Sequence, residues 1–275
     1  MTELGISFVT LSGTGFVGEP RFGVEARARA AAEAGFDAFG VRLAEFDDPE
    51  DLSELLELPA RHGVSVAEVE FLSGWALAGD ARAAERWIPL IRRLADEWGP
   101  FHLTSGEFGD GTLDLDIAAS NLRSIAAALE PSGVTLAVEA FAWSSIANYQ
   151  IANEIVTRAD APNAGLMLDV WHFFNTGGTL DWLGTLPSER VAAVQLNDGA
   201  RVHDDFLAHA RSGRLLPGAG DLDVTGLLAA LHGIGYRGRL MVESGYPQLF
   251  AADVTEAAGQ ALAAGRATLG QSQER

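Results

Sequence analysis

The sequence contains no cysteine, few basic residues and no long apolar run. The absence of cysteine excludes disulfide bonds, thiolate chemistry and zinc sites with sulfur ligands. No apolar run reaches the roughly 18 residues that a membrane-spanning helix needs. The first residues, Met1 to Gly5, also lack the basic segment and apolar stretch of a signal peptide. We therefore expect a cytoplasmic protein that does not interact with membranes.

Acidic residues outnumber basic residues by 38 to 19, which gives the 275-residue chain a net charge of −19. Such a surface repels nucleic acid and anionic lipid, so neither is an expected partner. It is compatible with small neutral substrates and with divalent cations. A general bias toward acidic, soluble surfaces accounts equally well for much of this charge.

Short apolar segments alternate with longer amphipathic segments along the whole chain. Several of the short segments lack polar alternation, as is typical of parallel strands that are buried on both faces. The predicted strands are Gly5–Leu11, Phe36–Leu43, Val64–Phe71, Pro100–Thr104, Val134–Glu139, Ala164–Asp169, Val191–Leu196 and Arg239–Glu243. The predicted helices are Val24–Ala34, Leu52–Arg61, Ala81–Trp98, Asp116–Leu129, Ala147–Ala159, Thr179–Leu186, Val224–Ile234 and Val254–Leu269.

Eight strand–helix units in a chain of this length predict a (β/α)₈ TIM barrel. An open, doubly wound sheet is the alternative, and it normally carries a glycine-rich nucleotide loop after its first strand. Gly13, Gly15 and Gly18 follow the first predicted strand, but they lead into a long loop rather than a tight turn. No linker rich in proline, glycine or serine divides the chain. We therefore predict one domain over residues 1–275, with a disordered tail from 270 to 275.

Each of the last four predicted strands presents an oxygen-bearing side chain at its end: Glu139, Asp169, Gln195 and Glu243. The C-terminal ends of the strands meet at one rim of a TIM barrel, where active sites are assembled. Three carboxylates gathered there repel each other unless a cation lies among them. Oxygen ligands favour Mn²⁺ or Mg²⁺, with Zn²⁺ and Co²⁺ as alternatives. A rim carboxylate paired with arginine or lysine is the simpler interpretation of any one of these residues, but not of four in register.

The same segments resemble the xylose isomerase-like superfamily over essentially the whole barrel. The resemblance rests on Glu139, on Asp169-Val170-Trp171-His172, on Val194-Gln195-Leu196-Asn197-Asp198 and on Val242-Glu243. The superfamily contains sugar isomerases and epimerases, hydroxypyruvate isomerase, inosose-processing enzymes and endonuclease IV. The resemblance implies that Glu139, Asp169, Gln195 and Glu243 bind one divalent metal ion. Glutamine as the third ligand is similar to the hydroxypyruvate isomerase pattern, whereas ketose 3-epimerases commonly have histidine there.

Several further residues are candidates for substrate contacts. His172 follows Asp169 in the superfamily's Asp-x-x-His arrangement, where the histidine faces the substrate; a hydrogen-bonded rim residue is the alternative. Arg214 begins a loop similar to a superfamily Arg-x-x-Pro-Gly-x-Gly-acid motif, in which the arginine holds a substrate oxygen. Glu70 and Glu107, near the ends of the third and fourth strands, are further candidates. Trp143 could form an apolar wall over a sugar, unless it only packs beneath its loop.

A metal ion bound to a carbonyl and an adjacent hydroxyl acidifies the intervening C–H by stabilising an enediolate. Glu139 and Glu243 would approach the substrate from different sides, one removing the proton and the other returning it. Return to the neighbouring carbon or to the opposite face makes the protein a sugar isomerase or epimerase, which we rank first. Loss of a β-hydroxyl, helped by an acid such as His172, makes it a dehydratase (lyase) of an inosose or dehydroshikimate-like keto-polyol.

Two other classes fit the sequence less well. An endonuclease IV-like phosphodiesterase needs a basic DNA-binding face and several histidine ligands, which the charge of −19 and a missing histidine on the third strand oppose. A non-catalytic barrel leaves the pair Glu139 and Glu243 unexplained. We therefore expect a small sugar or polyol as substrate. Many barrels of the superfamily dimerise, so a homodimer is a further expectation.

Overall fold

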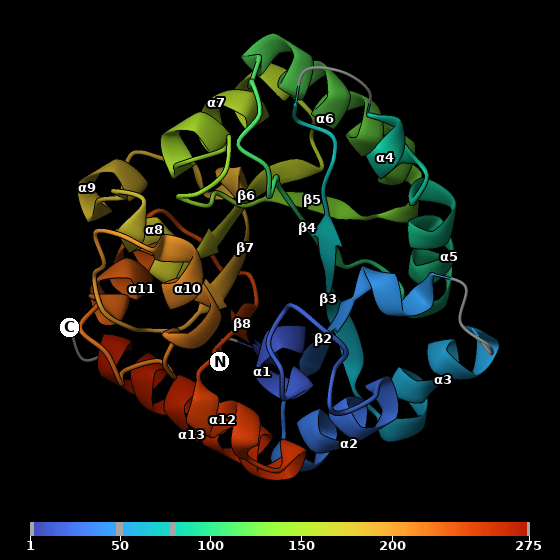
Figure 1. Ribbon diagram of the computed structural model, residues 1–275, viewed down its shortest axis with the longest axis vertical. Coiled ribbons are helices and arrows are strands. Elements are labelled where there is room, and N and C mark those ends of the chain that lie inside the picture. The colour runs from blue at the N-terminus through green and yellow to red at the C-terminus, as the bar shows by residue number, and fades with distance from the viewer. Residues whose placement is uncertain (1–2, 48–51, 78–80, 274–275) are drawn as a thin grey trace.

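Eight parallel strands form a closed barrel in which each strand pairs with its neighbours in chain order. The computed structural model describes residues 3–47, 52–77 and 81–273 (Figure 1). The strands are β1 Leu4–Ile6, β2 Ala38–Arg42, β3 Ser65–Leu72, β4 His102–Ser105, β5 Thr135–Val138, β6 Ala164–Asp169, β7 Val191–Leu196 and β8 Leu240–Val242. The prediction of a (β/α)₈ TIM barrel is confirmed.

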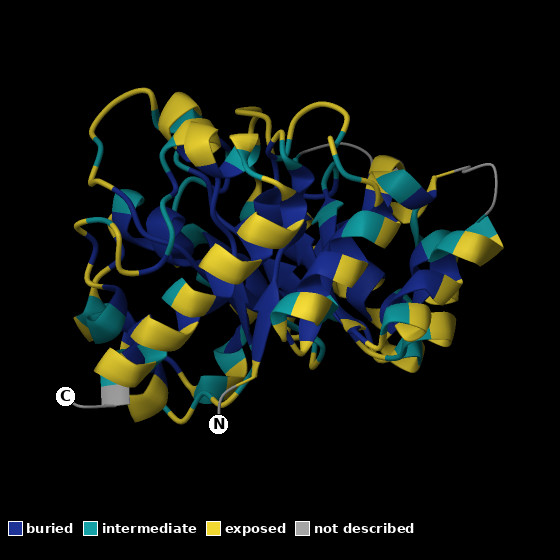
Figure 2. Cartoon of the chain, turned by 90° about the horizontal axis from the view of Figure 1, so that it is seen from below, coloured by how far each residue is buried: buried dark blue, intermediate teal, exposed yellow. Residues whose placement is uncertain are grey.

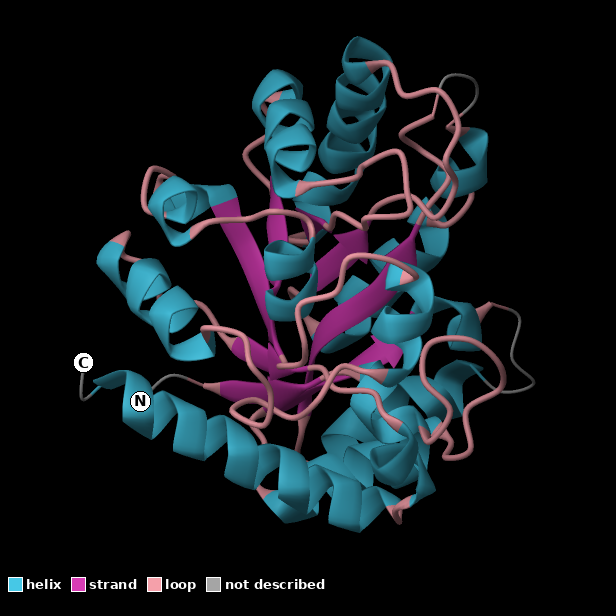
Figure 3. Ribbon diagram, turned by 60° about the vertical axis from the view of Figure 1, so that its left-hand side comes forward, coloured by secondary structure: helices cyan, strands magenta, loops and turns pink. Residues whose placement is uncertain are grey.

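Helices surround the barrel on its outside (Figure 3). They are α1 Phe8–Ser12, α2 Val24–Ala34, α3 Leu52–His62, α4 Arg82–Glu85, α5 Ile88–Trp98, α6 Leu115–Leu129, α7 Tyr149–Ala159, α8 Val170–Asn175, α9 Leu180–Leu183, α10 Phe206–Ser212, α11 Val224–Gly233, α12 Pro247–Ala251 and α13 Val254–Gln273. Single 3₁₀ turns lie at Leu43–Phe46, Glu130–Ser132 and Ser188–Arg190. Among the described residues, no helix combines the length and the apolar character needed to cross a membrane.

The strands and the inward faces of the outer helices consist of buried residues (Figure 2). Apolar side chains fill the space between them. Helix α6 shows the pattern: Ala118, Leu122, Ile125 and Leu129 repeat at helical spacing and are buried. Its first turn is fixed by Asp114, whose side chain accepts hydrogen bonds from two backbone N–H groups of the helix. Each buried leucine or isoleucine contributes roughly 1.5–3 kcal/mol relative to an exposed one. This packing holds the strands rigidly and so fixes the position of their C-terminal ends.

The first predicted strand, Gly5–Leu11, is wrong in its second half. Strand β1 ends at Ile6, and the chain then forms the short helix α1, which ends where Gly13 adopts a φ of 72°. Phe8, Val9 and Leu11 are all buried in this helix. A continuous apolar run has the same composition in a buried strand and in a helix buried on all sides, so periodicity could not separate the two.

The segment 81–98 forms two helices, not the predicted single one. Helix α4 ends at Glu85 and α5 begins at Ile88, with Pro89 in its first turn. Proline lacks the N–H that a continuous helix would need at this position, and it is well suited to start a new helix.

The tail that we expected to be disordered from residue 270 is helical as far as Gln273, while 274 and 275 lie outside the described residues. Helix α13 continues because Thr268 is buried and Leu269 packs against the core just before Gly270. The apolar contacts outweigh the low helix propensity of one glycine.

Inside the barrel, an apolar layer lies beneath a polar one. Ala137, Met167 and Ala193 pack together in the interior. Successive residues of a strand alternate between the two faces of the sheet, so a residue two positions further along also points inward. The residues at that position on these three strands are Glu139, Asp169 and Gln195. The alternation therefore directs three of the four predicted metal ligands toward the same rim.

Candidate active site

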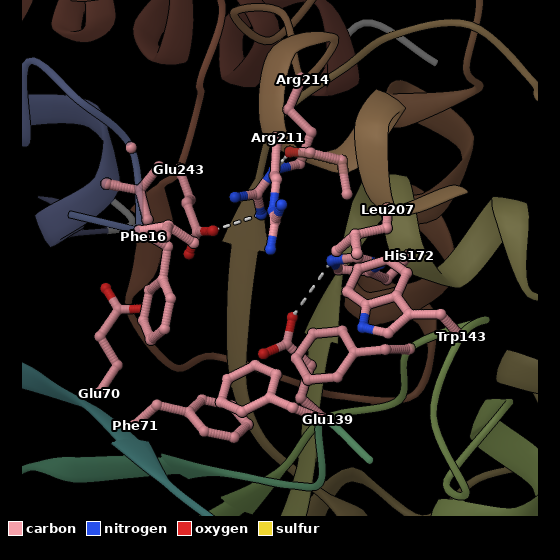
Figure 4. Close-up of a pocket in the computed structure, with 16 residues that line it drawn as sticks. Phe16, Glu70, Phe71, Glu139, Trp143, His172, Leu207, Arg211, Arg214 and Glu243 are labelled. Atoms are coloured by element: carbon pink, nitrogen blue, oxygen red, sulfur yellow. Dashed lines mark hydrogen bonds and ion pairs between the residues drawn. The ribbon is translucent and has the colours of Figure 1, made fainter. Parts of the chain in front are cut away.

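A cavity of about 270 Å³ opens at the C-terminal rim of the barrel (Figure 4). The polar side chains in its wall are Glu70, Glu139, His172, Arg211, Arg214 and Glu243. The aromatic side chains in its wall are Phe16, Phe71, Phe108, Phe141 and Trp143. The structure thus brings together both residues predicted to be catalytic and four of the five candidate substrate contacts, His172, Arg214, Glu70 and Trp143. Asp169 and Gln195 are fully buried and do not line the cavity.

Arg214 connects two of the predicted metal ligands. Its Nη1 donates hydrogen bonds to Asp169 Oδ2, 3.3 Å away, and to Glu243 Oε1. Burial alone would lower its pKa, but the charges of Glu243 and Asp169 outweigh this effect and raise the pKa above its ordinary value. Arg214 therefore carries a positive charge that partly neutralises the acidic rim.

The loop that carries Arg214 is held in place by Asp198, directly after β7. Its carboxylate accepts backbone hydrogen bonds from Gly199 (2.8 Å), Gly218 (3.1 Å) and Leu222 (3.0 Å). Asp198 and Leu215 also exchange backbone hydrogen bonds. A buried carboxylate that accepts several N–H groups ties the two ends of a long loop together. The position of the Arg214 guanidinium over the rim follows from this arrangement.

Gln195 is oriented by an acid from the opposite side of the barrel. Its Nε2 donates to Glu68 Oε2 at 3.1 Å, and His102 Nε2 lies 3.0 Å from the same oxygen. The amide Oε1 of Gln195 has no hydrogen-bond partner among the described residues. Glu68 thus holds the amide so that its oxygen stays available for another group. Glu68 was not among the candidates predicted from the sequence.

Three rim carboxylates lie close enough to share one cation. Oxygens of Glu68, Glu70 and Glu243 all lie within 4.8 Å of one another, and all three residues are buried. Each has one carboxylate oxygen without a hydrogen-bond partner in the described part of the chain. Buried oxygens without partners are costly, and a hard divalent cation is the ligand that such oxygens favour. The donor set therefore fits a divalent metal ion, whose identity it does not specify.

The crowding of these acids changes their protonation. Burial, reinforced by Glu243 and Glu68, raises the pKa of Glu70 well above its ordinary value. Burial, reinforced by Asp169 and Glu243, does the same for Glu139. For Glu243, burial raises the pKa to about 8, although Arg214 opposes the shift. In the metal-free protein these carboxyl groups therefore keep their protons to a higher pH than an exposed glutamate does.

His172 is buried beside Glu139 and is held neutral. Its Nε2 lies 3.9 Å from Glu139 Oε1, and its ring packs edge-on against Phe141 and Trp143. Burial, and then the positive charge of Arg214, lowers the pKa of His172 well below its ordinary value. A neutral imidazole is a poor proton donor, so the acid role that the sequence suggested for His172 does not fit its environment. It suits a hydrogen-bonding role toward Glu139 or a substrate.

Trp143 and Phe141 form one flat wall of the cavity. The two ring centroids lie 5.1 Å apart, with an angle of 12° between the ring planes. The Phe108 ring is stacked against that of Phe141 with a centroid distance of 5.7 Å, also at 12°. Phe16 extends the wall from the loop after α1, with its ring 5.8 Å from that of Phe108. Only Phe108 of these is exposed. Parallel aromatic faces suit the flat side of a ring-shaped ligand.

Several site residues escaped the sequence-based analysis. Glu68 could have been found, because it lies two positions before Glu70 in a strand that is otherwise apolar and so points to the same side. Asn197, whose Nδ2 donates to Asp169 Oδ2 at 2.5 Å, was visible only as part of a motif. No sequence pattern marked Arg211 or Phe16 as a site residue, because Arg211 lies in the short helix α10 and Phe16 in the loop after α1. Glu107 lies elsewhere: its carboxylate accepts hydrogen bonds from the backbone N–H groups of residues 75 and 76.

The metal-free protein should lose stability as the pH rises from 6.5 to 9. The raised pKa values mean that the folded state holds more protons than the unfolded state above pH 4.5, so deprotonation favours unfolding. As the pH rises through the Glu243 pKa of about 8, the free energy of unfolding should fall by about 1–2 kcal/mol. Urea denaturation in EDTA across this range measures it. His172 does not contribute there, because its lowered pKa affects stability only below about pH 6.5. A free energy of unfolding that rises with pH would contradict the prediction.

Comparison with known proteins matches residues 28–268 of the chain to the model of the xylose isomerase-like TIM barrel family. The chain is 30% identical over 251 residues to the 3-dehydroshikimate dehydratase of Pseudomonas aeruginosa, a match that covers 88% of this chain and 38% of that protein. It is 28% identical over 130 residues to the inosose isomerase of Bacillus subtilis, which covers 46% of each. The match thus spans less than half the length of each of these two relatives.

The fold agrees with that of a zinc-bound protein. The crystal structure of the IolI protein with a bound zinc atom superimposes with a TM-score of 0.85, covering 98% of this chain and 99% of that chain. The two sequences are 18% identical, so this likeness concerns the fold. The relatives named by the sequence matches are a dehydratase and an isomerase.

Proposed function

Since the chain belongs to the xylose isomerase-like TIM barrel family, we propose that it is a divalent-metal-dependent enzyme that removes water from a small cyclic hydroxy-ketone. The observation that carries the proposal is the rim: buried carboxylates with unpartnered oxygens border a cavity whose other walls are aromatic. The dehydratase match supports the choice of reaction, because it covers 88% of the chain, against 46% for the inosose isomerase. The dehydratase, second in the ranking from sequence alone, therefore comes first.

We propose Glu139, Asp169, Gln195 and Glu243 as the metal ligands. This set shares Glu243 with the close cluster of Glu68, Glu70 and Glu243, in which Glu68 orients the amide of Gln195. The Gln195 amide supports this assignment, because its nitrogen is engaged by Glu68 while its oxygen is free. When bound, a divalent ion would polarise the substrate carbonyl and thereby acidify the adjacent C–H bond. Oxygen ligands make Mn²⁺ or Mg²⁺ the favoured ion.

Glu243 is the proposed proton acceptor. Its carboxylate is buried at the wall of the cavity, where it can reach a bound ring, and glutamate is a common general base. It would take the proton from the carbon next to the carbonyl, and the electron pair of that C–H bond would form a new C=C bond. The β-hydroxyl would leave with its bonding electrons and a proton from Glu139, giving one molecule of water. His172, 3.9 Å from Glu139, would keep that carboxyl aligned.

An isomerase is the second candidate, and the same pair of residues favours it. Glu139 could instead deliver its proton to the former carbonyl carbon, while the proton of the adjacent hydroxyl passes to the former carbonyl oxygen. The hydroxy-ketone then isomerises without loss of water. Proton removal and return from different strands suit both outcomes.

One NMR experiment separates the two candidates. The Mn²⁺-loaded protein is incubated in D₂O with 3-dehydroshikimate, an inosose and a panel of ketoses, and manganese is removed before the spectra are recorded. A dehydratase produces olefinic or aromatic proton signals and consumes the β-hydroxyl. An isomerase produces a new carbonyl position with deuterium on the neighbouring carbon. A protein that exchanges no C–H proton in any of these compounds would contradict both.

Replacing Gln195 with histidine should change the metal preference. An amide oxygen is a hard ligand, whereas imidazole nitrogen favours Zn²⁺ and Co²⁺. We expect the wild type to prefer Mn²⁺ or Mg²⁺ for activity, and Gln195→His to bind Zn²⁺ or Co²⁺ about tenfold more tightly relative to Mn²⁺. Competitive titration of the apo-protein with each metal measures the order of affinities.

A matched variant tests the orienting role of Glu68. Glu68→Gln keeps the shape of the side chain but weakens its hold on the Gln195 amide, so metal affinity should fall while the order of metals stays the same. An unchanged order of metals in Gln195→His would show that Gln195 is not a ligand.

A further inference from the structure

The cavity wall carries two arginines in different states. Arg214 is engaged by Asp169 and Glu243, as described above. Arg211 also points into the cavity (Figure 4). It forms no ion pair or side-chain hydrogen bond with any of the residues that the structure describes. Arg211 is exposed and lines the cavity, so its guanidinium, which has no acidic partner among the described residues, is available to a ligand that enters from solvent.

Helix α10 presents Arg211 to the cavity as part of one face. Leu207, Ala210 and Arg211 all line the cavity. Residues three and four apart lie on the same side of a helix, so this face is a consequence of the helical repeat. Arg214 folds back onto the same helix, with its Nε donating to the Ala210 carbonyl at 3.0 Å. The direction of Arg211 is therefore set by the helix and not by a flexible loop.

The cavity wall combines acidic, cationic and aromatic side chains. Glu70, Glu139 and Glu243 contribute the acidic groups, and the uncommitted cation is Arg211. The stacked rings of Phe108, Phe141 and Trp143 form another part of the same wall. A neutral polyol needs hydrogen-bond partners around its whole ring, and these walls offer few. A ring with an anionic substituent would place its apolar faces on the aromatic wall and its charge on Arg211.

We propose that Arg211 is a specificity-determining residue that selects substrates whose ring bears a carboxylate. The inference rests on the proposed function, which places the reacting atoms of the substrate at Glu139 and Glu243. A guanidinium donates two parallel N–H bonds to the two oxygens of a carboxylate. A phosphate dianion would need further cations or a cradle of backbone N–H groups. Among the described residues that line the cavity, Arg211 is the only arginine or lysine not engaged by an acid.

Isothermal titration of the Mg²⁺-loaded protein with unreactive ring compounds tests this proposal. The probes are 3,4-dihydroxybenzoate, uncharged 1,2-dihydroxybenzene and 3,4-dihydroxyphenyl phosphate. We expect the carboxylate to bind about tenfold more tightly than the uncharged ring. Arg211→Ala should remove this difference and leave the affinity for 1,2-dihydroxybenzene unchanged, and Arg211→Lys should retain part of it. Arg29→Ala, on the exposed side of α2, is the matched control and should change neither affinity.

Three outcomes of the titration would overturn the proposal. These outcomes are equal binding of the charged and uncharged rings by the wild type, equal weakening of both by Arg211→Ala, and tighter, Arg211-dependent binding of the phosphate than of the carboxylate. The titration requires no turnover, so it is separate from the proposed reaction. A protein that shows the Arg211-dependent preference but neither dehydrates nor isomerises any tested compound would contradict the proposed reaction and leave the binding role of Arg211 intact.

Discussion

Glu243→Gln should lower the turnover of the metal-saturated enzyme by about 10²- to 10⁴-fold, the usual contribution of a general base. The amide keeps the shape of the side chain and an oxygen that can bind the ion, but it cannot accept a proton. It can also still accept a hydrogen bond from Arg214, which in the wild type donates to Glu243 Oε1. Steady-state kinetics at saturating Mn²⁺, together with a metal titration of each variant, separate lost chemistry from lost metal.

Asp169→Asn is the matched comparison for this variant. Asp169 is fully buried, does not line the cavity and has no proposed proton-transfer role. Its replacement should therefore act through metal affinity, and excess Mn²⁺ should restore much of its activity. If excess Mn²⁺ also restored Glu243→Gln to wild-type turnover, Glu243 would be a ligand only, and the proton acceptor would have to be another group.

Arg214→Met should cost the metal-free protein about 3–5 kcal/mol of unfolding free energy at pH 8. Methionine fills a similar volume but leaves Asp169 and Glu243 without the cation that they share. The loss should shrink at pH 5.5, because the buried carboxyl groups can then take up protons in place of the lost charge. Urea denaturation in EDTA at the two pH values measures the difference.

Two further measurements complete this experiment. Arg29→Met, which removes an exposed arginine of α2, should change stability by less than about 0.5 kcal/mol. Added Mn²⁺ should restore part of the stability of Arg214→Met, because a divalent ion among the same carboxylates supplies positive charge. An Arg214→Met protein as stable as the wild type at pH 8 would mean that the acids are already neutral and that the ion pair does not stabilise the rim.

The barrel and the position of its rim followed from local patterns in the sequence. Apolar strands and amphipathic helices can be predicted from neighbouring residues, because the alternation within a strand and the repeat of a helix are local properties. Asp169 and Gln195, at the ends of β6 and β7, pair directly in the sheet register. Strand ends gather at one rim in any closed parallel barrel, so the sequence alone could predict that Glu139, Asp169 and Gln195 converge with Glu243.

The contacts that give these residues their properties were decided by the tertiary structure. Gln195 meets Glu68 across 127 positions of sequence, because closure of the barrel places β3 opposite β7. Arg214 reaches Asp169 and Glu243 because Asp198 folds its loop back over the rim. Burial at these positions, and not residue type, keeps His172 neutral.

The same distinction explains the elements that the sequence misassigned or missed. The run from Phe8 to Leu11 is equally apolar as a strand or as a buried helix, and only its packing beside the barrel made it α1. Arg211 has nothing in its local sequence to mark it, and it faces the cavity because α10 lies across the rim. The sequence by itself determined which residues lie at the end of each strand, because that depends on neighbours along the chain. Which of them touch, and with what charge, depends on distances across the barrel that no local pattern encodes.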